Sequence, residues 1–209
     1  MLIVGLTRIC VAILVVFVLV LTFVGRISVG DTNPFDYFGY FTNQTSLLAS
    51  IVFVATGSLM VAGRPVPSWL MSARGVAAAC LVVVAVIYNV LVPGTGTAPA
   101  WVSAVLHVGF PLFVLGDWLI VGDRAPLPWR RLWIVLPYPV GWLTVVLIRG
   151  ATDGWVPYGF LLPERGAAAL VGHSVGLLLA LLAAGSAIWA GSRVRGLVLR
   201  ARVLASSPV

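Results

Sequence analysis

The chain has 209 residues, of which 61% are hydrophobic and only 9% are charged. Soluble globular domains carry about a quarter of charged residues, so this composition excludes a soluble fold and indicates an integral membrane protein. The formal net charge is +7, but the basic residues are all arginines that gather at the ends of apolar segments, so we exclude nucleic acid as a partner.

Six apolar segments follow one another, and each approaches the roughly 20 residues that a helix needs to cross a bilayer. We therefore predict an all-α fold, a polytopic bundle of six transmembrane helices that forms a single integral membrane domain. The first segment resembles the apolar part of a signal peptide, but no A-x-A-like cleavage site follows it, so we expect a retained helix. The fifth contains Pro137 and Pro139, which predict a kink. The predicted spans cover about residues 9–24, 41–62, 73–92, 101–121, 132–148 and 166–190, followed by a basic cytoplasmic tail over 191–209.

The arginines predict the orientation of this bundle. Ten of them fall on the side of the two termini and three on the opposite side. Because cytoplasmic loops are enriched in basic residues, we expect both termini in the cytoplasm. Arginine without lysine, together with much Val, Leu and Ala, suggests a GC-rich bacterial coding sequence and hence a bacterial plasma membrane. The ten are Arg8, Arg64, Arg74, Arg124, Arg130, Arg131, Arg193, Arg195, Arg200 and Arg202; the three are Arg26, Arg149 and Arg165.

A polar run, Tyr40-Phe41-Thr42-Asn43-Gln44-Thr45-Ser46, opens the second span from the outer side. Thr42, Thr45 and Ser46 follow a spacing that places them on one helix face. Small hydroxyl residues let membrane helices approach and hydrogen-bond, and for Thr45 and Ser46 this packing role and a functional role both stay open. We predict that Thr42 is a nucleophile, because a histidine lies at a comparable depth.

That histidine, His107, lies six residues into the fourth span, about 9 Å deep at 1.5 Å per residue. Ionisable residues inside a membrane are costly and usually mark function. Pro111 has no N–H, so the carbonyl of residue 107 loses its helical partner, and an opened helix needs polar groups or water nearby. We interpret His107 as the base for Thr42; a histidine that only bonds across helices at a packing kink is the alternative.

Other polar residues gather at the same end of the predicted bundle. Asn43 and Asn89 are candidate donors to an oxyanion, and Thr45, Tyr88, His173, Trp155 and Tyr158 are candidates for contact with a substrate. His173 has three open interpretations: a second functional group, an interhelical hydrogen bond, or a side chain that reaches outward. Gly172, Gly176, Ala180 and Ala184 form a small-residue ladder that predicts close helix contact beside it.

Asp117 lies ten residues from His107, about 15 Å along one helix axis. This separation excludes it as the third member of a catalytic triad, so we expect it to pair with Arg124, Arg130 or another arginine of the inner side. Cys10 and Cys80 are isolated in apolar segments, and no metal or redox motif can be built from them. We therefore expect neither a metal nor a cofactor.

The chain resembles the androgen-induced-protein family of six-helix membrane hydrolases and its bacterial relatives. Three motifs carry the resemblance: Tyr40-Phe41-Thr42, His107 with a following proline and an acid at Asp117, and the loop Gly154-Trp155-Val156-Pro157-Tyr158-Gly159-Phe160-Leu161. Animal members look like threonine hydrolases that cleave fatty acid esters of hydroxy fatty acids, which implies a Thr42 nucleophile and a His107 base here. The chain departs from them in the proline spacing and in having Asp rather than Glu at 117.

The resemblance and the residues together predict an intramembrane ester hydrolase, in which neutral His107 takes the proton of Thr42 and an acyl-threonine forms. The expected partners are a lipid-like ester and membrane lipids, with the site towards the outer leaflet and the aromatic loop from Trp155 to Phe160 as a lid. Three alternatives stay open: a protein that binds or transports a lipid or small solute without reaction, a b-type haem held by His107 and His173, and a purely structural membrane partner.

Overall fold

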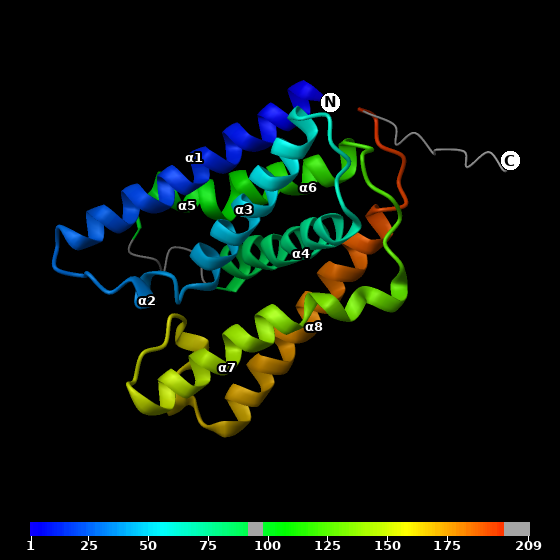
Figure 1. Cartoon of the computed structure of the whole chain (residues 1–209). Coiled ribbons are helices and arrows are strands. Elements are labelled where there is room, and N and C mark those ends of the chain that lie inside the picture. Colours follow the sequence, from blue (N-terminus) through cyan, green and yellow to red (C-terminus); the bar gives the residue numbers. More distant parts are fainter. Residues whose placement is uncertain (92–97, 199–209) are drawn as a thin grey trace, which may run out of the picture.

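The computed structural model describes residues 1–91 and 98–198, and throughout these ranges the fold is all-α without a strand. Six helical segments are long and apolar enough to cross a membrane (Figure 1). The predicted six-helix membrane architecture is thus confirmed. The segments are α1 (Leu2–Ile27), α3 (Phe41–Val61), α4 (Ser68–Leu91), α5 (Ala100–Ala104) continued by η1 (Val105–Gly109) and α6 (Phe110–Ile120), η2 (Trp129–Val135) continued by α7 (Pro137–Thr152), and α8 (Ala167–Gly191).

The connections contain three short helices, α2 (Pro34–Tyr37), η3 (Gly159–Leu161) and η4 (Pro163–Arg165). The predicted kink of the fifth span is a change of helix type, because a 3₁₀ turn ends at Val135 and α7 begins with Pro137. Of the predicted basic tail, residues 199–209 lie outside the described ranges. The tail residues before them pair with the end of α6: the N–H groups of Leu197 and Val198 donate to the carbonyl of Ile120.

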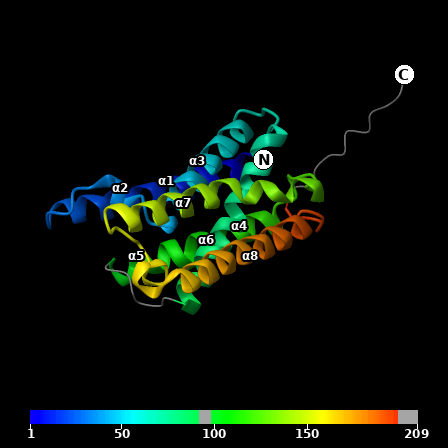
Figure 2. The same ribbon diagram turned by 90° about the horizontal axis from the view of Figure 1, so that it is seen from below.

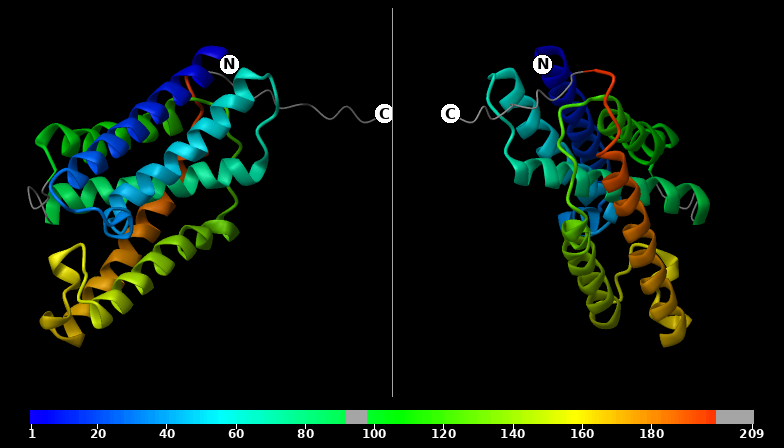
Figure 3. Two further views of the ribbon diagram at one scale, coloured as in Figure 1. Left: turned by 60° about the vertical axis from the view of Figure 1, so that its left-hand side comes forward. Right: turned by 90° about the vertical axis from the view of Figure 1, so that its right-hand side faces the viewer.

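The six segments define two ends of the molecule. The N-terminal end holds Met1, the end of α6 and the last turn of α8, and the Thr42 end holds the start of α3 and the loop between α7 and α8 (Figure 1). Helices α7 and α8 lie beside each other on the face nearest the viewer in Figure 2. Helix α8 diverges from α1 and α3 towards the Thr42 end, as Figure 3 also shows, whereas α7 is held to α2 there by the ion pair of Arg149 with Asp36.

Helix α3 is the central element, and its predicted polar face is buried. The side chains of Thr42, Thr45, Ser46, Ser50 and Thr56 are all at most 7% exposed. The hydroxyls of Ser46 and Ser50 have no hydrogen-bond partner among the described residues. Small side chains that pack without a bond are those that allow close helix contact, so the packing interpretation applies to Ser46.

The closest helix contact lies between α1 and α3, not along α8 as the small-residue ladder predicted. A Cβ atom added to Gly57 would lie 2.6 Å from the carbonyl oxygen of Gly5, which only glycine permits. On α8, Gly172 and Gly176 are exposed, and an added Cβ would meet nothing within 4 Å. The prediction of close contact at these two glycines was wrong, because they lie on a face of α8 that no other described helix covers.

Two arginines and two aspartates form a buried network at the N-terminal end, which we call the Arg–Asp cluster: Arg8 of α1, Arg74 of α4, Asp117 of α6 and Asp123. Arg8 binds Asp117 through two nitrogens, with Nε to Oδ1 at 2.8 Å and Nη2 to Oδ2 at 3.0 Å. Arg74 Nη2 lies 2.7 Å from the same Oδ2. Asp123 Oδ2 accepts from Arg8 Nη1 at 2.6 Å and from Arg74 Nη1 at 3.0 Å. The four charges cancel, so the cluster joins three spans without a net buried charge.

The cluster refines two predictions from the sequence. Asp117 does pair with arginines of its own end, but with Arg8 and Arg74 rather than with Arg124 or Arg130. Arg8 was expected to flank the first span, yet α1 begins at Leu2 and Arg8 is 0% exposed inside it. Arg124 has another role, because its guanidinium donates to the carbonyls of Gly191 and Val194 and closes the end of α8.

Candidate functional site

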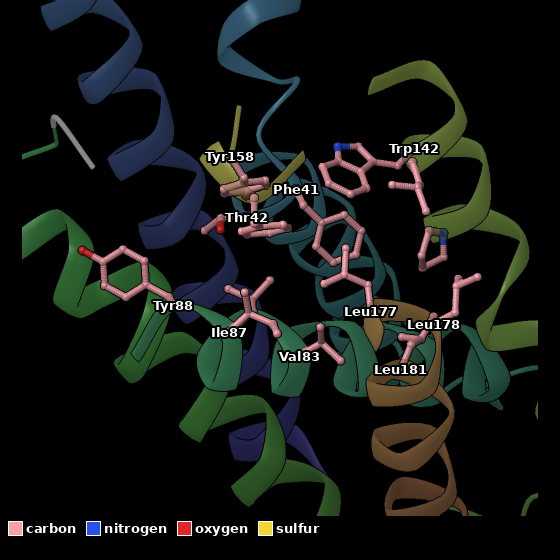
Figure 4. Close-up of a pocket in the computed structure, with 14 residues that line it drawn as sticks. Phe41, Thr42, Val83, Ile87, Tyr88, Trp142, Tyr158, Leu177, Leu178 and Leu181 are labelled. Atoms are coloured by element: carbon pink, nitrogen blue, oxygen red, sulfur yellow. The ribbon is translucent and has the colours of Figure 1, made fainter. Parts of the chain in front are cut away.

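Thr42 lies in the first turn of α3 and contributes to an apolar pocket between α3, α4, α7 and α8 (Figure 4). Its side chain is buried, at 7% exposure. Apart from Tyr88, the side chains of α4 and α8 that line the pocket are aliphatic. They are Val83, Val84, Ile87, Leu177, Leu178 and Leu181. Among the described residues of the lining, only Thr42, Tyr88 and Tyr158 carry a hydroxyl group, so Thr42 is one of few groups there that can react.

Tyr158 comes from the loop between α7 and α8 and lies next to Thr42 (Figure 4). Burial raises the pKa of the Tyr158 phenol above its ordinary value, while the nearby polar groups of Thr42 and Phe41 act in the opposite direction. The first N–H groups of a helix have no intrahelical partner. Tyr158 thus lines the pocket beside the first turn of α3, together with Phe41 and Thr42.

The predicted lid loop contacts the pocket with two of its aromatic residues. The ring of Phe160 stacks on that of Tyr158 at 5.4 Å and 5°, and both rings line the pocket. Trp155 does not line it. Its ring packs edge-on against Tyr40 and lies under the guanidinium of Arg149, at 4.3 Å. Trp155 thus fixes the loop to the end of α7 rather than facing Thr42.

His107 lies in a π-helical turn, Val105–Gly109, directly before α6. The helix is opened at this histidine, as Pro111 predicted, and single π turns are frequent at functional sites. The amide of Asn89 provides a hydrogen-bond donor for the carbonyl that Pro111 leaves without a helical partner. Its Nδ2 donates to the carbonyl of His107 at 3.3 Å and to that of Ala85 at 2.8 Å. Both amide protons of Asn89 are thus donated to backbone oxygens, which argues against its role as an oxyanion donor.

The imidazole of His107 has two contacts that fix its orientation. Nδ1 lies 3.0 Å from the carbonyl oxygen of Ser103, so the Nδ1–H tautomer is the one that satisfies this contact. The ring stacks on Tyr88 with a centroid distance of 3.5 Å and an angle of 6°. Nε2 is then the nitrogen left for chemistry. No hydrogen bond joins His107 to Thr42 within residues 1–91 and 98–198; Tyr88, which stacks on one and shares the pocket with the other, connects them.

His173 does not line the pocket, but its ring is 5.8 Å from that of Phe160, which does. Its Nδ1 is buried and has no partner among the described residues. The two histidines therefore pack against different aromatic rings of one pocket. No group of three or more His, Cys, Asp or Glu side chains is placed to hold a metal ion in the described part of the chain.

Two further candidates are held by structural hydrogen bonds outside the pocket. Asn43 Nδ2 donates to the carbonyl of Tyr37 at 2.9 Å and ties α3 to α2. The hydroxyl of Thr45 lies 2.9 Å from that of Tyr138, whose ring stacks on Phe41. These bonds position the start of α3 and thereby Thr42.

Sequence reasoning missed Phe41 and Trp142 as parts of the site. The Trp142 ring packs at 4.9 Å from that of Phe41, and its Nε1–H donates to the carbonyl of Gly39 at 2.8 Å. A tryptophan inside an apolar span gives no signal for this role, because the bond forms between residues 103 positions apart.

No protein-family model, no curated protein and no solved structure matches the chain. The family resemblance therefore rests on the three motifs, of which Thr42, Tyr158 and Phe160 meet in one pocket and His107 lies behind Tyr88 at its edge.

Proposed function

We propose that this protein is an intramembrane hydrolase of amphiphilic esters, with Thr42 as nucleophile and His107 as base. The observation that carries the proposal is the location of the Thr42 hydroxyl at the polar end of an otherwise apolar pocket between four membrane spans. A lipid-like ester has the matching chemistry, because its chain suits the aliphatic wall and its carbonyl suits the few donors near Thr42.

The reaction would proceed by acyl transfer. The Thr42 oxygen attacks the ester carbonyl as its proton passes to His107 Nε2, the alcohol leaves with a proton from the imidazolium, and water hydrolyses the acyl-threonine. The backbone N–H groups at the start of α3 would stabilise the oxyanion, assisted by the positive end of the helix dipole. Tyr158 lines the pocket beside these donors, so a substrate carbonyl would bind next to its ring.

The proposal requires a local movement. His107 stacks on Tyr88 and does not hydrogen-bond to Thr42. The Tyr88 ring would therefore have to turn aside so that His107 Nε2 can come within reach of the Thr42 hydroxyl. Catalytic hydrogen bonds are often long in unliganded enzymes and shorten once the substrate is bound.

The test is the hydrolysis of long-chain esters, among them a fatty acid ester of a hydroxy fatty acid, by purified protein in lipid. Thr42→Ala and His107→Ala should each abolish turnover, while Thr144→Ala, on the exposed face of α7, should leave it unchanged. Turnover that survives Thr42→Ala in a folded protein would contradict the proposal.

A lipid-binding protein without turnover is the second candidate. The nearly complete apolar lining favours it, and so does the absence of a hydrogen bond between Thr42 and His107 among the described residues. It predicts that the wild type binds a labelled fatty acyl chain and releases no product. In that case Thr42→Ala would change the affinity for the chain only.

The location of the site follows from the arginines. We infer that both termini face the cytoplasm of a bacterial cell, which would direct the Thr42 end towards the outer leaflet of the plasma membrane. A C-terminal reporter that fluoresces only in the cytoplasm should then fluoresce, and a dark reporter on folded protein would reverse the orientation.

A further inference from the structure

A groove separate from the Thr42 pocket lies between α3 and α7. Leu47 and Leu48 of α3 form one wall, and Val145 and Val146 of α7 form the other. Gly141 also lines the groove, and a Cβ atom added there would meet nothing within 4 Å. An open space thus separates α3 from α7 along this stretch.

The groove opens towards the lipid. Both of its walls belong to helices long and apolar enough to span a membrane, and Leu48 and Val145 at its edges are 43% and 56% exposed. Contact of apolar surface with hydrocarbon is more favourable than its contact with water, so an acyl chain is favoured over water in the groove. An acyl chain from the surrounding bilayer is the occupant with the matching chemistry.

Polar residues close the groove at the Thr42 end, where Asn33, Gln44 and Arg149 line it. Arg149 is already engaged by two carboxylates, with Nη2 2.8 Å from Asp36 and Nε 2.9 Å from Asp153. These three charges sum to −1, so they offer no free cation to an anionic headgroup. The chemistry favours a zwitterionic phospholipid, with its headgroup at the level of Arg149 and a chain between α3 and α7.

Trp142 separates this groove from the Thr42 pocket, because its ring lines both. The ring is held by one hydrogen bond to the carbonyl of Gly39 and by contact with Phe41. Turning it would join the two spaces into one path from the bilayer to Thr42.

We propose that the groove between α3 and α7 binds an acyl chain of a zwitterionic membrane lipid and that Trp142 gates its passage to the Thr42 pocket. Binding in the groove is independent of the reaction proposed above, whereas the role of the gate rests on the proposed hydrolase.

The binding step is tested in nanodiscs of phosphatidylcholine that contain a small fraction of phosphatidylcholine with a diazirine in its acyl chain. After irradiation, adducts on groove residues of α3 and α7 are counted relative to adducts on exposed Val171 and Leu179 of α8. Gly141→Leu, which fills the groove, should lower this ratio several-fold, and the matched Gly176→Leu, on exposed α8, should not. Gly141→Ala, a smaller change that keeps the helix, should lower it less. A ratio near one in the wild type, or one that Gly141→Leu leaves unchanged, would overturn the proposal.

The gating step is read from turnover. Gly141→Leu should slow hydrolysis of a long-chain ester several-fold more than that of a short, water-soluble ester, since the short ester does not need the groove. Equal loss for both esters would refute the path past Trp142. If no ester is turned over by the wild type, the proposed hydrolase fails, while the photolabelling still decides whether the groove binds lipid.

Discussion

The two ends of this bundle use polar residues in opposite ways. At the N-terminal end, Arg8, Arg74, Asp117 and Asp123 are charged, buried and bonded to one another. At the Thr42 end, the pocket is lined by aliphatic side chains, aromatic rings and uncharged hydroxyls, and the proposed nucleophile Thr42 and the proposed base His107 do not hydrogen-bond to each other among the described residues.

The difference separates stability from function. A buried charge needs its partners to remain buried, so the Arg–Asp cluster has one arrangement and fixes α1, α4 and α6. Neutral hydroxyls and rings can exchange partners at lower cost, which allows a pocket to open and close around a ligand. We expect substitutions at the N-terminal end to reduce stability and those at the Thr42 end to change activity or binding.

The largest effect is expected for Asp117→Ala. The change leaves two buried guanidinium groups short of a carboxylate, and breaking a buried pair in this way costs about 3–5 kcal/mol. Thermal unfolding in detergent, followed by circular dichroism, measures it. The control is Asp31→Ala, because Asp31 forms a half-exposed pair with Arg26 that solvent screens. Similar losses in both variants would contradict the assignment of the Arg–Asp cluster as a stabilising network.

A smaller effect is expected for Gly57→Ala. The added methyl would lie against the carbonyl of Gly5 and push α1 from α3, and overpacking of this kind costs about 1–3 kcal/mol. The same substitution at Gly176 meets open space and should leave the unfolding temperature equal or slightly higher, because alanine favours helix. If Gly176→Ala proves the more damaging change, the close packing of α1 on α3 is not what holds this end together.

The architecture could be predicted from the sequence because hydrophobic length alone determines the number of spans. The opening of the fourth span at His107 could also be predicted, since Pro111 removes one N–H whatever the surroundings are. The Arg–Asp cluster could not, because Arg8 and Asp117 are 109 positions apart and only the tertiary fold, in which α1 packs on α3, α3 on α4 and α4 on α6, brings them together. The signal that remains in the sequence is weaker: an arginine and an aspartate inside apolar segments each require a partner.

At the Thr42 end the prediction found residue types but not their partners. Thr42 and Tyr158 were both candidates and lie together, whereas Asn43, Thr45 and Asn89 make structural bonds. The predicted helix contact along α8 failed for the same reason. Gly172 and Gly176 have the spacing of a contact face, but no helix lies opposite them among the described residues.

The pH dependence of stability should report on the ionisation of the Arg–Asp cluster at the N-terminal end. Burial opposes ionisation of Asp123, but Arg74 and Arg8 outweigh it and hold the pKa of Asp123 below its ordinary value of 3.8. A carboxylate with a depressed pKa stabilises the fold above its unfolded pKa and loses that contribution as pH falls through the folded value. The unfolding temperature of the wild type should therefore stay constant as the pH is lowered to about 4 and should fall at lower pH. Asp123→Asn should be less stable near neutral pH and show a shallower acid decline; an identical decline would assign the acid sensitivity to other groups.

The smallest effect on stability is expected for Thr42→Val, which replaces the hydroxyl by a methyl of similar size. Valine suits the apolar wall of the pocket, and loss of one neutral hydrogen bond costs about 0.5–1.5 kcal/mol at most. The same change removes the proposed nucleophile, so ester turnover should vanish while the unfolding temperature hardly moves. A large drop in stability would mean that Thr42 serves the fold, as Asp117 does, and the contrast between the two ends would not hold.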